Sequence, residues 1–234
     1  MTTAIPDPPR ARHAVRAPAA AIVLAAAVLA AGCGTQRFEA RPSIPMPLVD
    51  RIPAVVGLYV APEFRDYVHK EKRDGLDYEI AVGPGQSEGF ARLLEAMFTR
   101  VVRVPSAQSG AGTDAEIRGV LEPVLEELSF ITPRDAGEQL YAVSLKYRIN
   151  GYSPQGELVD SWSFTGYGAS PASSIPGQGT DALQEATRLA MRDAGAKIAT
   201  EIHEQAIVRG LLPPEASPSA PPVEDAPAEI QPRS

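Results

Sequence analysis

The chain has 234 residues, of which 44% are hydrophobic and 22% are charged, and its formal net charge is −7. This length suggests one domain with extensions, and the apolar content is sufficient for a sizeable core. An acidic surface repels phosphate backbones, so we expect no nucleic-acid partner.

The first 32 residues have the order of a secretory signal sequence. Arg10, Arg12 and Arg16 precede an uncharged apolar run from Ala19 to Ala31. As a helix, a run of about 13 residues spans roughly 20 Å, which is too short to cross about 30 Å of hydrocarbon. We therefore predict a signal peptide over residues 1–32 that is absent from the mature protein.

The apolar run ends in Leu29-Ala30-Ala31-Gly32-Cys33, which resembles the bacterial lipobox. The resemblance implies cleavage before Cys33 and a mature N-terminus that carries three fatty acyl chains, palmitate among them. Several chains give stable attachment, whereas one chain holds a protein only marginally. Gly34 stands where aspartate would be the inner-membrane retention signal, so the resemblance implies the outer membrane, with the protein facing the periplasm. The alternative is a small buried cysteine at the end of a signal-anchor helix.

Composition divides the rest of the chain into three parts. Residues 33–53 carry the predicted lipidated cysteine and a proline-rich segment, which we interpret as a tether that reaches roughly 60 Å. Residues 54–210 are predicted to form the folded periplasmic domain. Residues 211–234 are proline-rich and acidic, with few large apolar side chains, and are predicted to be disordered.

Hydrophobic periodicity predicts the elements of the domain in chain order. Residues 54–60 form a short apolar strand, and residues 65–83 form a hairpin around Asp74-Gly75. A helix begins at Ser87, followed by a strand over 99–104 and a small-residue loop over 106–113. Strands follow over 115–131, with a bulge near Pro123, and over 141–150 and 158–167. A long helix over 181–207 is capped by Thr180 and Asp181.

The second helix has a defined inner face, because the small and apolar residues of that segment recur at helical spacing. Its alanines indicate a close approach to the sheet. This inner face comprises Leu183, Ala186, Ala190, Ala194, Ile198 and Ile202. The fold class that follows is α+β, with a mostly antiparallel sheet and two helices packed on one face.

Gly85-Gln86-Ser87-Glu88-Gly89 matches the G-x-S-x-G pattern of a nucleophile elbow. Asp160 or Asp181, followed by His203, would supply the remaining triad residues in hydrolase order. However, His203 lies within a predicted helix, and the parallel units that carry an elbow are missing. We therefore interpret Ser87 as the N-cap of the helix, with a lipid-tethered serine hydrolase as the alternative.

Other polar groups give weaker signals. Gly83, Gly85 and Gly89 match a dinucleotide loop loosely, but Glu88 would oppose a pyrophosphate there. His69 and His203 lack further ligands at metal spacing, so we expect no metal and no cofactor. Glu126 and Glu127 are adjacent on a strand and are expected to face opposite ways.

The run from His69 to Arg73 is interpreted as a solvated hairpin arm, with contact to anionic lipid, glycan or a partner as the alternative. Aromatic residues also gather on the last hairpin, and core packing explains most of them. Any aromatic that faces away from the helices is a candidate contact for sugar or protein. The set comprises Tyr141, Tyr147, Tyr152, Trp162, Phe164 and Tyr167.

Several stretches together resemble a family of uncharacterised proteobacterial outer-membrane lipoproteins. They are Pro62–Val68, Val82-Gly83 leading to Ala96–Phe98, Gly119–Pro123, Leu145–Arg148, Ser161–Ser163, Gly166–Gly168 and Ala190–Ala194. In element order the domain is also similar to the TolB amino-terminal and CsgG-like periplasmic folds. That likeness implies a role in outer-membrane assembly, envelope export or cell-wall synthesis, although fold alone does not determine function. The sequence thus predicts a non-catalytic envelope lipoprotein that binds a protein or glycan partner.

Overall fold

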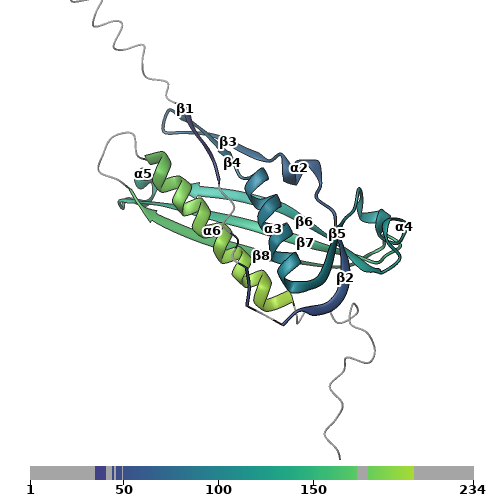
Figure 1. Ribbon diagram of the computed structural model, residues 1–234. Coiled ribbons are helices and arrows are strands. Elements are labelled where there is room, and N and C mark those ends of the chain that lie inside the picture. The colour runs from purple at the N-terminus through teal and green to yellow at the C-terminus, as the bar shows by residue number, and fades with distance from the viewer. Residues whose placement is uncertain (1–34, 41–43, 45, 49, 173–178, 203–234) are drawn as a thin grey trace, which may run out of the picture.

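The computed structural model describes residues 35–40, 44, 46–48, 50–172 and 179–202. The predicted signal peptide, Cys33, His203 and the predicted tail over 211–234 lie outside these residues. The described chain begins at one end of an elongated α+β domain (Figure 1).

The larger sheet has five strands in the order β5-β2-β6-β7-β8. They are β2 (Ile52–Leu58), β5 (Phe98–Arg103), β6 (Ile117–Ile131), β7 (Leu140–Tyr152) and β8 (Leu158–Pro171). Pairing of β6, β7 and β8 is antiparallel, but β2 runs parallel to both of its neighbours. The α+β prediction is confirmed, whereas the mostly antiparallel sheet is corrected to a mixed one. The parallel part arises because α3 lies between β2 and β5 in the chain, which allows a crossover connection.

A second sheet of three strands has the order β1-β4-β3. The predicted hairpin is confirmed, with β3 over Val68–Arg73 and β4 over Leu76–Ala81. Asp74 and Gly75 have φ angles of 53° and 78°, as a tight two-residue turn requires. Strand β1 (Thr35–Glu39) adds to β4 in parallel and was not expected.

Strand β1 corrects the predicted tether over residues 33–53. Phe38, Ala40 and Ile44 are all buried, so the first described part of this segment packs on the domain. Ile44 lies against Gly89 in the first long helix, and the side-chain amide of Gln184 in the second donates to the carbonyl of Glu39. The described residues from 35 to 44 therefore belong to the folded domain and do not reach away from it.

Two long helices, α3 (Gly83–Met97) and α6 (Gly179–Glu201), cover one face of the five-stranded sheet (Figure 1). We call this the covered face. The predicted inner face of α6 is confirmed, because all six of its predicted residues are fully buried. The described chain also contains one-turn helices at α2 (Pro62–Arg65), α4 (Gly110–Thr113) and α5 (Pro133–Ala136), with a 3₁₀ turn over Ala107–Ser109. The predicted loop over 106–113 thus contains short helical turns.

The starts of both long helices differ from the sequence prediction. Helix α3 begins at Gly83, four residues before Ser87, and its N-cap is Val82. Helix α6 begins at Gly179, so Thr180 and Asp181 lie inside its first turn. The hydroxyl of Thr180 instead bonds to the Gln36 side chain in β1. Both predicted caps are therefore wrong.

Glycines in β8 allow α6 to approach the sheet closely. A β-carbon added at Gly166 would lie 2.1 Å from the carbonyl oxygen of Ala190, and one added at Gly168 would lie 2.1 Å from that of Ala186. Real β-carbons do not approach backbone oxygens that closely, so only glycine is compatible with this packing. The alanine-rich face of α6 and the two strand glycines together confirm the predicted close approach.

The bulge expected near Pro123 lies a little further along β6, where the register shifts between Leu125 and Glu127. Pro123 itself is an ordinary strand residue opposite Ile149. Strand β2 ends at Leu58, opposite Leu121, so no strand pairs with β6 beside Pro123 on that side. The missing N–H of the proline therefore breaks no ladder there.

The centre of the core is aromatic. The rings of Phe64 and Phe90 have centroids 5.5 Å apart, and Phe90 and Tyr147 are 5.2 Å apart, both in edge-to-face geometry. Tyr147 is fully buried, and burial raises the pKa of its phenol far above the ordinary value. Its hydroxyl has no hydrogen-bond partner among the described residues. This cluster joins α2, α3 and β7 into one core.

Candidate functional site

The face of the five-stranded sheet opposite α3 and α6 is called the open face. Alternation along β7 sends Val143, Leu145 and Tyr147 to the covered face, where they are buried. The intervening residues of β7 and their partners on β6 and β8 therefore lie on the open face. They include Ser129, Ile131, Ala142, Ser144, Lys146, Arg148, Ser163, Thr165 and Tyr167.

The middle of the open face carries a small charged group around Glu126. Its carboxylate lies 3.1 Å from the ammonium of Lys146 and 3.4 Å from the guanidinium of Arg148. The hydrogen bond from Lys146 is the largest influence and holds the pKa of Glu126 below its usual value. These exposed pairs orient side chains but add little stability.

The expectation that Glu126 and Glu127 face opposite ways is wrong. Glu127 lies in register with Lys146, and Glu126 is the extra residue of the bulge and contacts the same lysine. Both carboxylates therefore lie on the open face. A bulge inserts one residue without a partner, which cancels the strict alternation of the strand.

Beside this charged group the open face becomes apolar and lacks charge. A shallow hollow of about 200 Å³ lies between β6, β7 and β8, with Ser129, Ile131, Ala142, Ser144 and Tyr167 in its lining. Tyr167 is 62% exposed and Ile131 is 42% exposed. A tyrosine exposed beside small residues offers a flat ring with a polar tip to an incoming partner.

Tyr167 also borders a second hollow of about 410 Å³, around the edge of the sheet. This hollow lies between β8 and α6 and is lined in addition by Leu189, Arg192 and Ala196. The tyrosine therefore separates two adjoining hollows, one on the open face and one beside the helix. We take these two hollows and Tyr167 as the candidate binding surface.

Side chains of α6 occupy the free edge of β8 at the same place. The carboxylate of Asp193 accepts a hydrogen bond from the backbone N–H of Tyr167 at 2.9 Å, and the ammonium of Lys197 donates to the carbonyl of Thr165 at 2.6 Å. Lys197 also lies 5.1 Å from the centre of the Tyr167 ring. An incoming strand cannot pair here without displacing these groups. Contact at this surface therefore involves side chains rather than strand addition.

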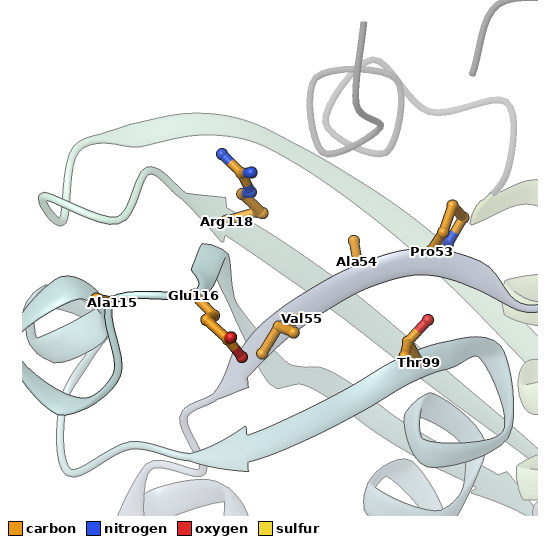
Figure 2. Close-up of a pocket in the computed structure, with 7 residues that line it drawn as sticks. All are labelled: Pro53, Ala54, Val55, Thr99, Ala115, Glu116 and Arg118. Carbon is orange, nitrogen blue, oxygen red and sulfur yellow. The ribbon is translucent and has the colours of Figure 1, made fainter. Parts of the chain in front are cut away.

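A larger and more polar hollow of about 530 Å³ lies where β2, β5 and β6 begin (Figure 2). Pro53 and Val55 come from β2 and Thr99 from β5. Arg118 lies at the start of β6, and Glu116 lies in the turn just before it. Glu116 pairs with Arg100, and Arg118 makes no ion pair within the described part of the chain. One exposed arginine beside an open hollow does not define a ligand.

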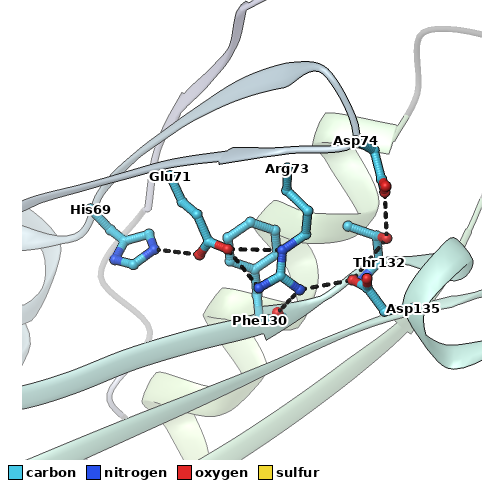
Figure 3. Close-up of polar contacts among 7 residues, drawn as sticks. All are labelled: His69, Glu71, Arg73, Asp74, Phe130, Thr132 and Asp135. Atoms are coloured by element: carbon cyan, nitrogen blue, oxygen red, sulfur yellow. Dashed lines mark hydrogen bonds and ion pairs between the residues drawn. The ribbon is translucent and has the colours of Figure 1, made fainter.

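The hairpin arm from His69 to Arg73 is only partly solvated. Lys70 and Lys72 are exposed, whereas His69, Glu71 and Arg73 turn toward β6 and α5 (Figure 3). The guanidinium of Arg73 donates to the carbonyl of Phe130 and to the carboxylate of Asp135, both at 2.8 Å. This arm therefore joins the three-stranded sheet to the end of β6.

Asp135 completes this junction as part of a capping box. It accepts the backbone N–H of Thr132 at 2.8 Å, and Thr132 also bonds to Asp74 in the hairpin turn. The hydrogen bond from the Thr132 backbone, followed by that from Arg73, lowers the pKa of Asp135 to about 2. The contacts of this cluster join the hairpin, the end of β6 and α5.

Ser87 does not have the geometry of a nucleophile elbow. It lies inside α3 and is 8% exposed, and its hydroxyl donates to the carbonyl of Gly83 at 2.8 Å. An elbow serine stands at a sharp turn between strand and helix with its hydroxyl exposed. His203 lies outside the described residues, so its distance from Ser87 stays open. Ser87 is neither the predicted cap nor an exposed nucleophile.

Two further features concern ligands and membranes. His69 bonds to Glu71 at 3.2 Å, and no group of three or more possible metal ligands occurs among the described residues. No helix within the described ranges is long and apolar enough to cross a membrane. Cys33, the predicted lipidation site, lies outside these ranges.

The sequence analysis proposed that any aromatic residue facing away from the helices could contact a partner. Tyr167 meets this criterion, although it was not named individually. Trp162 and Phe164 share one parity along β8 and lie on the covered face, whereas Tyr167 has the other parity. The alternation of residues along β8 was therefore a usable sequence signal for the exposure of Tyr167. Ile131 and Ser144 were missed, because only the pairing of β6, β7 and β8 brings them beside Tyr167.

No protein-family model matches the sequence, and no curated protein matches it either. Among solved structures, a Xanthomonas campestris protein of family DUF330 matches with TM-score 0.42 and 14% identity, over 70% of this chain and 91% of that one. A Helicobacter pylori protein described as a neuraminyllactose-binding hemagglutinin homolog matches with TM-score 0.45 and 11% identity, over 72% and 97%. Uncharacterized lipoprotein B from Nitrosomonas europaea matches with TM-score 0.36 and 10% identity, over 68% and 90%. These similarities are distant and assign no activity.

Proposed function

We propose that this protein is a non-catalytic envelope lipoprotein, anchored through Cys33 to the outer membrane and facing the periplasm. In this proposal it binds a protein or glycan partner during envelope assembly or export. The lipobox-like sequence up to Cys33, with Gly34 after it, supports the anchor and its destination. The proposal includes membership in a family of uncharacterised proteobacterial outer-membrane lipoproteins and a fold similar to the TolB amino-terminal and CsgG-like domains.

The observation that carries the binding role is Tyr167. Its ring is 62% exposed at the border between two hollows, beside Ile131 and small residues of β7. An exposed aromatic ring among small neighbours can stack on a sugar or enter a pocket of a protein, and such residues contribute strongly to binding. Asp193 holds the backbone of Tyr167 and Lys197 lies beside its ring, so the aromatic is already positioned.

Photo-crosslinking in living cells tests the binding surface. A photoreactive amino acid in place of Tyr167 should give defined crosslinked products that mass spectrometry identifies as a protein or a glycan. The control is the same amino acid in place of Glu95, which is exposed on α3, away from the open face. Equal products from both positions, or none from position 167, would contradict a binding role for Tyr167.

The anchor has its own test. Cys33→Ala should abolish incorporation of radiolabelled palmitate and leave either uncut precursor or soluble protein. A Cys33→Ala protein that still carries acyl chains and fractionates like the wild type would refute the lipoprotein assignment. The serine-hydrolase alternative has little structural support, since the Ser87 hydroxyl is buried and bonded. Labelling of Ser87 by a fluorophosphonate probe would restore it.

A further inference from the structure

The predicted attachment point is very close to the folded domain. Strand β1 begins at Thr35, so only Gly34 separates it from Cys33. Two residues of fully extended chain span at most about 7 Å. This limit holds for any conformation of those residues. If Cys33 carries the lipid, the membrane surface lies close to the start of β1.

Several other segments lie at the same end of the domain as Thr35. Thr35 is in register with Asp77 at the start of β4, beside the hairpin turn, and Arg73 joins that hairpin to Asp135 in α5. Gln36 bonds to Thr180 in the first turn of α6. We call this the anchor end, comprising the start of β1, the turn at Asp74-Gly75, α5 and the start of α6. These segments gather at the end of the domain where β1 begins (Figure 1).

The opposite end of the domain is far away. Strand β7 starts beside α5 at Leu140 and ends at Tyr152, and a turn over residues 153–156 follows. At about 3.3 Å per residue, β7 alone separates the two ends by about 40 Å. The turn contacts the α4 region, where the N–H of Ala111 donates to the carbonyl of Pro154. The described part of α6 likewise starts at the anchor end and runs away from it across the sheet (Figure 1).

We propose that the anchor end lies against the phospholipid head groups, so that the domain stands on the membrane in one fixed orientation. This proposal rests on the proposed lipidation of Cys33. A flexible tether would let the domain rotate, but β1 removes that freedom by packing on β4 with Phe38 buried. Lys72 and Arg134 are exposed at this end, with Lys72 3.9 Å from Asp77, and exposed acidic residues Asp74 and Glu138 lie nearby, so the lipid chains rather than surface charge hold the domain against the head groups. Lipid contact, which the sequence analysis gave as the alternative role of the arm from His69 to Arg73, is therefore proposed for the tip of this arm.

The orientation also places the candidate binding surface near the membrane. Tyr167 lies opposite Ser144 on β7, four residues from the start of that strand at Leu140. It is therefore about 13 Å from the anchor end along the strand direction. A partner that contacts Tyr167 would then be bound at the membrane surface, whereas the turn over 153–156 points away from it.

Fluorescence quenching on vesicles tests the orientation. Cys33 is the only cysteine, so a cysteine introduced into the lipidated full-length protein is its only free thiol. Lys72→Cys places a fluorophore at the anchor end, and the matched control Gln155→Cys places it at the far end, where the side chain is also exposed. The vesicles contain phosphatidylethanolamine and phosphatidylglycerol with nitroxide-labelled head groups. We expect quenching at position 72 to exceed that at position 155 several-fold.

A lengthened linker provides the second comparison. About 16 glycine and serine residues inserted between Gly34 and Thr35 add a flexible span of roughly 20 Å. Quenching at position 72 should then fall toward that at position 155, while the protein stays bound to the vesicles. Equal quenching at both positions in the normal protein, or no effect of the insertion, would overturn the fixed orientation. Failure to bind vesicles at all, with Cys33→Ala behaving identically, would instead refute the lipid anchor.

Discussion

The two faces of the five-stranded sheet obey different physical constraints. The covered face is filled by Tyr147, Phe164 and the helices above them, and a single methyl group at Gly168 has no room. The open face carries ion pairs around Glu126 and an exposed Tyr167. Packing limits the choice of residue on the covered face, whereas solvent leaves the open face free to acquire a contact surface. Substitutions on the two faces should therefore differ strongly in effect.

The largest effect is expected at Tyr147, in the centre of the covered face. Tyr147→Ala should lower the free energy of unfolding by about 3–5 kcal/mol, because it leaves a cavity between Phe64 and Phe90. Tyr147→Phe keeps the ring and removes a buried hydroxyl without a partner, so it should be neutral or stabilising by about 1 kcal/mol. Denaturant titration of the three proteins measures both changes. A loss with phenylalanine would show that the hydroxyl has a partner that the described residues do not reveal.

A smaller but substantial loss is expected at Gly168. Gly168→Ala places a β-carbon 2.1 Å from the Ala186 carbonyl oxygen, so α6 must shift away from β8. Such overpacking should lower the free energy of unfolding by about 3 kcal/mol. The matched control is Gly112→Ala, where nothing lies within 4 Å of the added atom. Similar unfolding midpoints for the two variants would contradict the close approach of α6.

Substitutions at Ser87 test whether this residue is buried inside α3 or caps the start of the helix. Ser87→Asp would bury a carboxylate beside the carbonyl of Gly83, and should cost about 2–3 kcal/mol. Ser87→Ala removes only a bond to a carbonyl that the helix already satisfies, so its cost should stay below about 1 kcal/mol. An N-cap serine would give the reverse order, with aspartate tolerated. Thermal unfolding of both variants distinguishes the two roles.

Asp135, at the end of the sheet, should make the free energy of unfolding depend on pH in the acidic range. Its folded pKa of about 2 lies below the ordinary value of 3.8, so the unfolded state binds the proton more readily. The stabilisation from Asp135 is complete above about pH 4 and is lost as the pH falls toward 2. Asp135→Asn should therefore be less stable than the wild type near neutral pH, and the difference should shrink between pH 4 and pH 2. A difference that is constant over this range would exclude Asp135 as its source.

The smallest effect is expected at Tyr167 on the open face. Tyr167→Ala removes a ring that is 62% exposed and should change the free energy of unfolding by less than about 0.5 kcal/mol. Phe164→Ala, three residues earlier on the same strand but on the covered face, should cost about 3–5 kcal/mol. Chemical denaturation of this pair compares the two faces within one strand. A large loss at Tyr167 would mean that its ring supports the fold.

Elements whose signals are local could be predicted from the amino-acid sequence. The Asp74-Gly75 turn, the inner face of α6 and the alternation along β7 each depend on neighbours within a few residues. The spacing of residues on one face of a helix or strand is set by its backbone geometry, so it can be recognised without knowledge of the tertiary structure. The lipobox-like sequence is equally local, and lipidation of Cys33 remains a prediction.

Features that depend on distant partners became visible only in the folded molecule. Strand β1 was hidden in a proline-rich segment, because its stability comes from pairing with β4, about 40 residues later in the chain. The parallel position of β2 follows from the crossover through α3, and the shared face of Glu126 and Glu127 follows from one bulge. Ser87 lies inside a helix that extends back to Gly83, and Pro84 in its first turn was a usable local start signal. For β1 and β2 the deciding energy comes from contacts between residues far apart in sequence, which a local pattern does not encode.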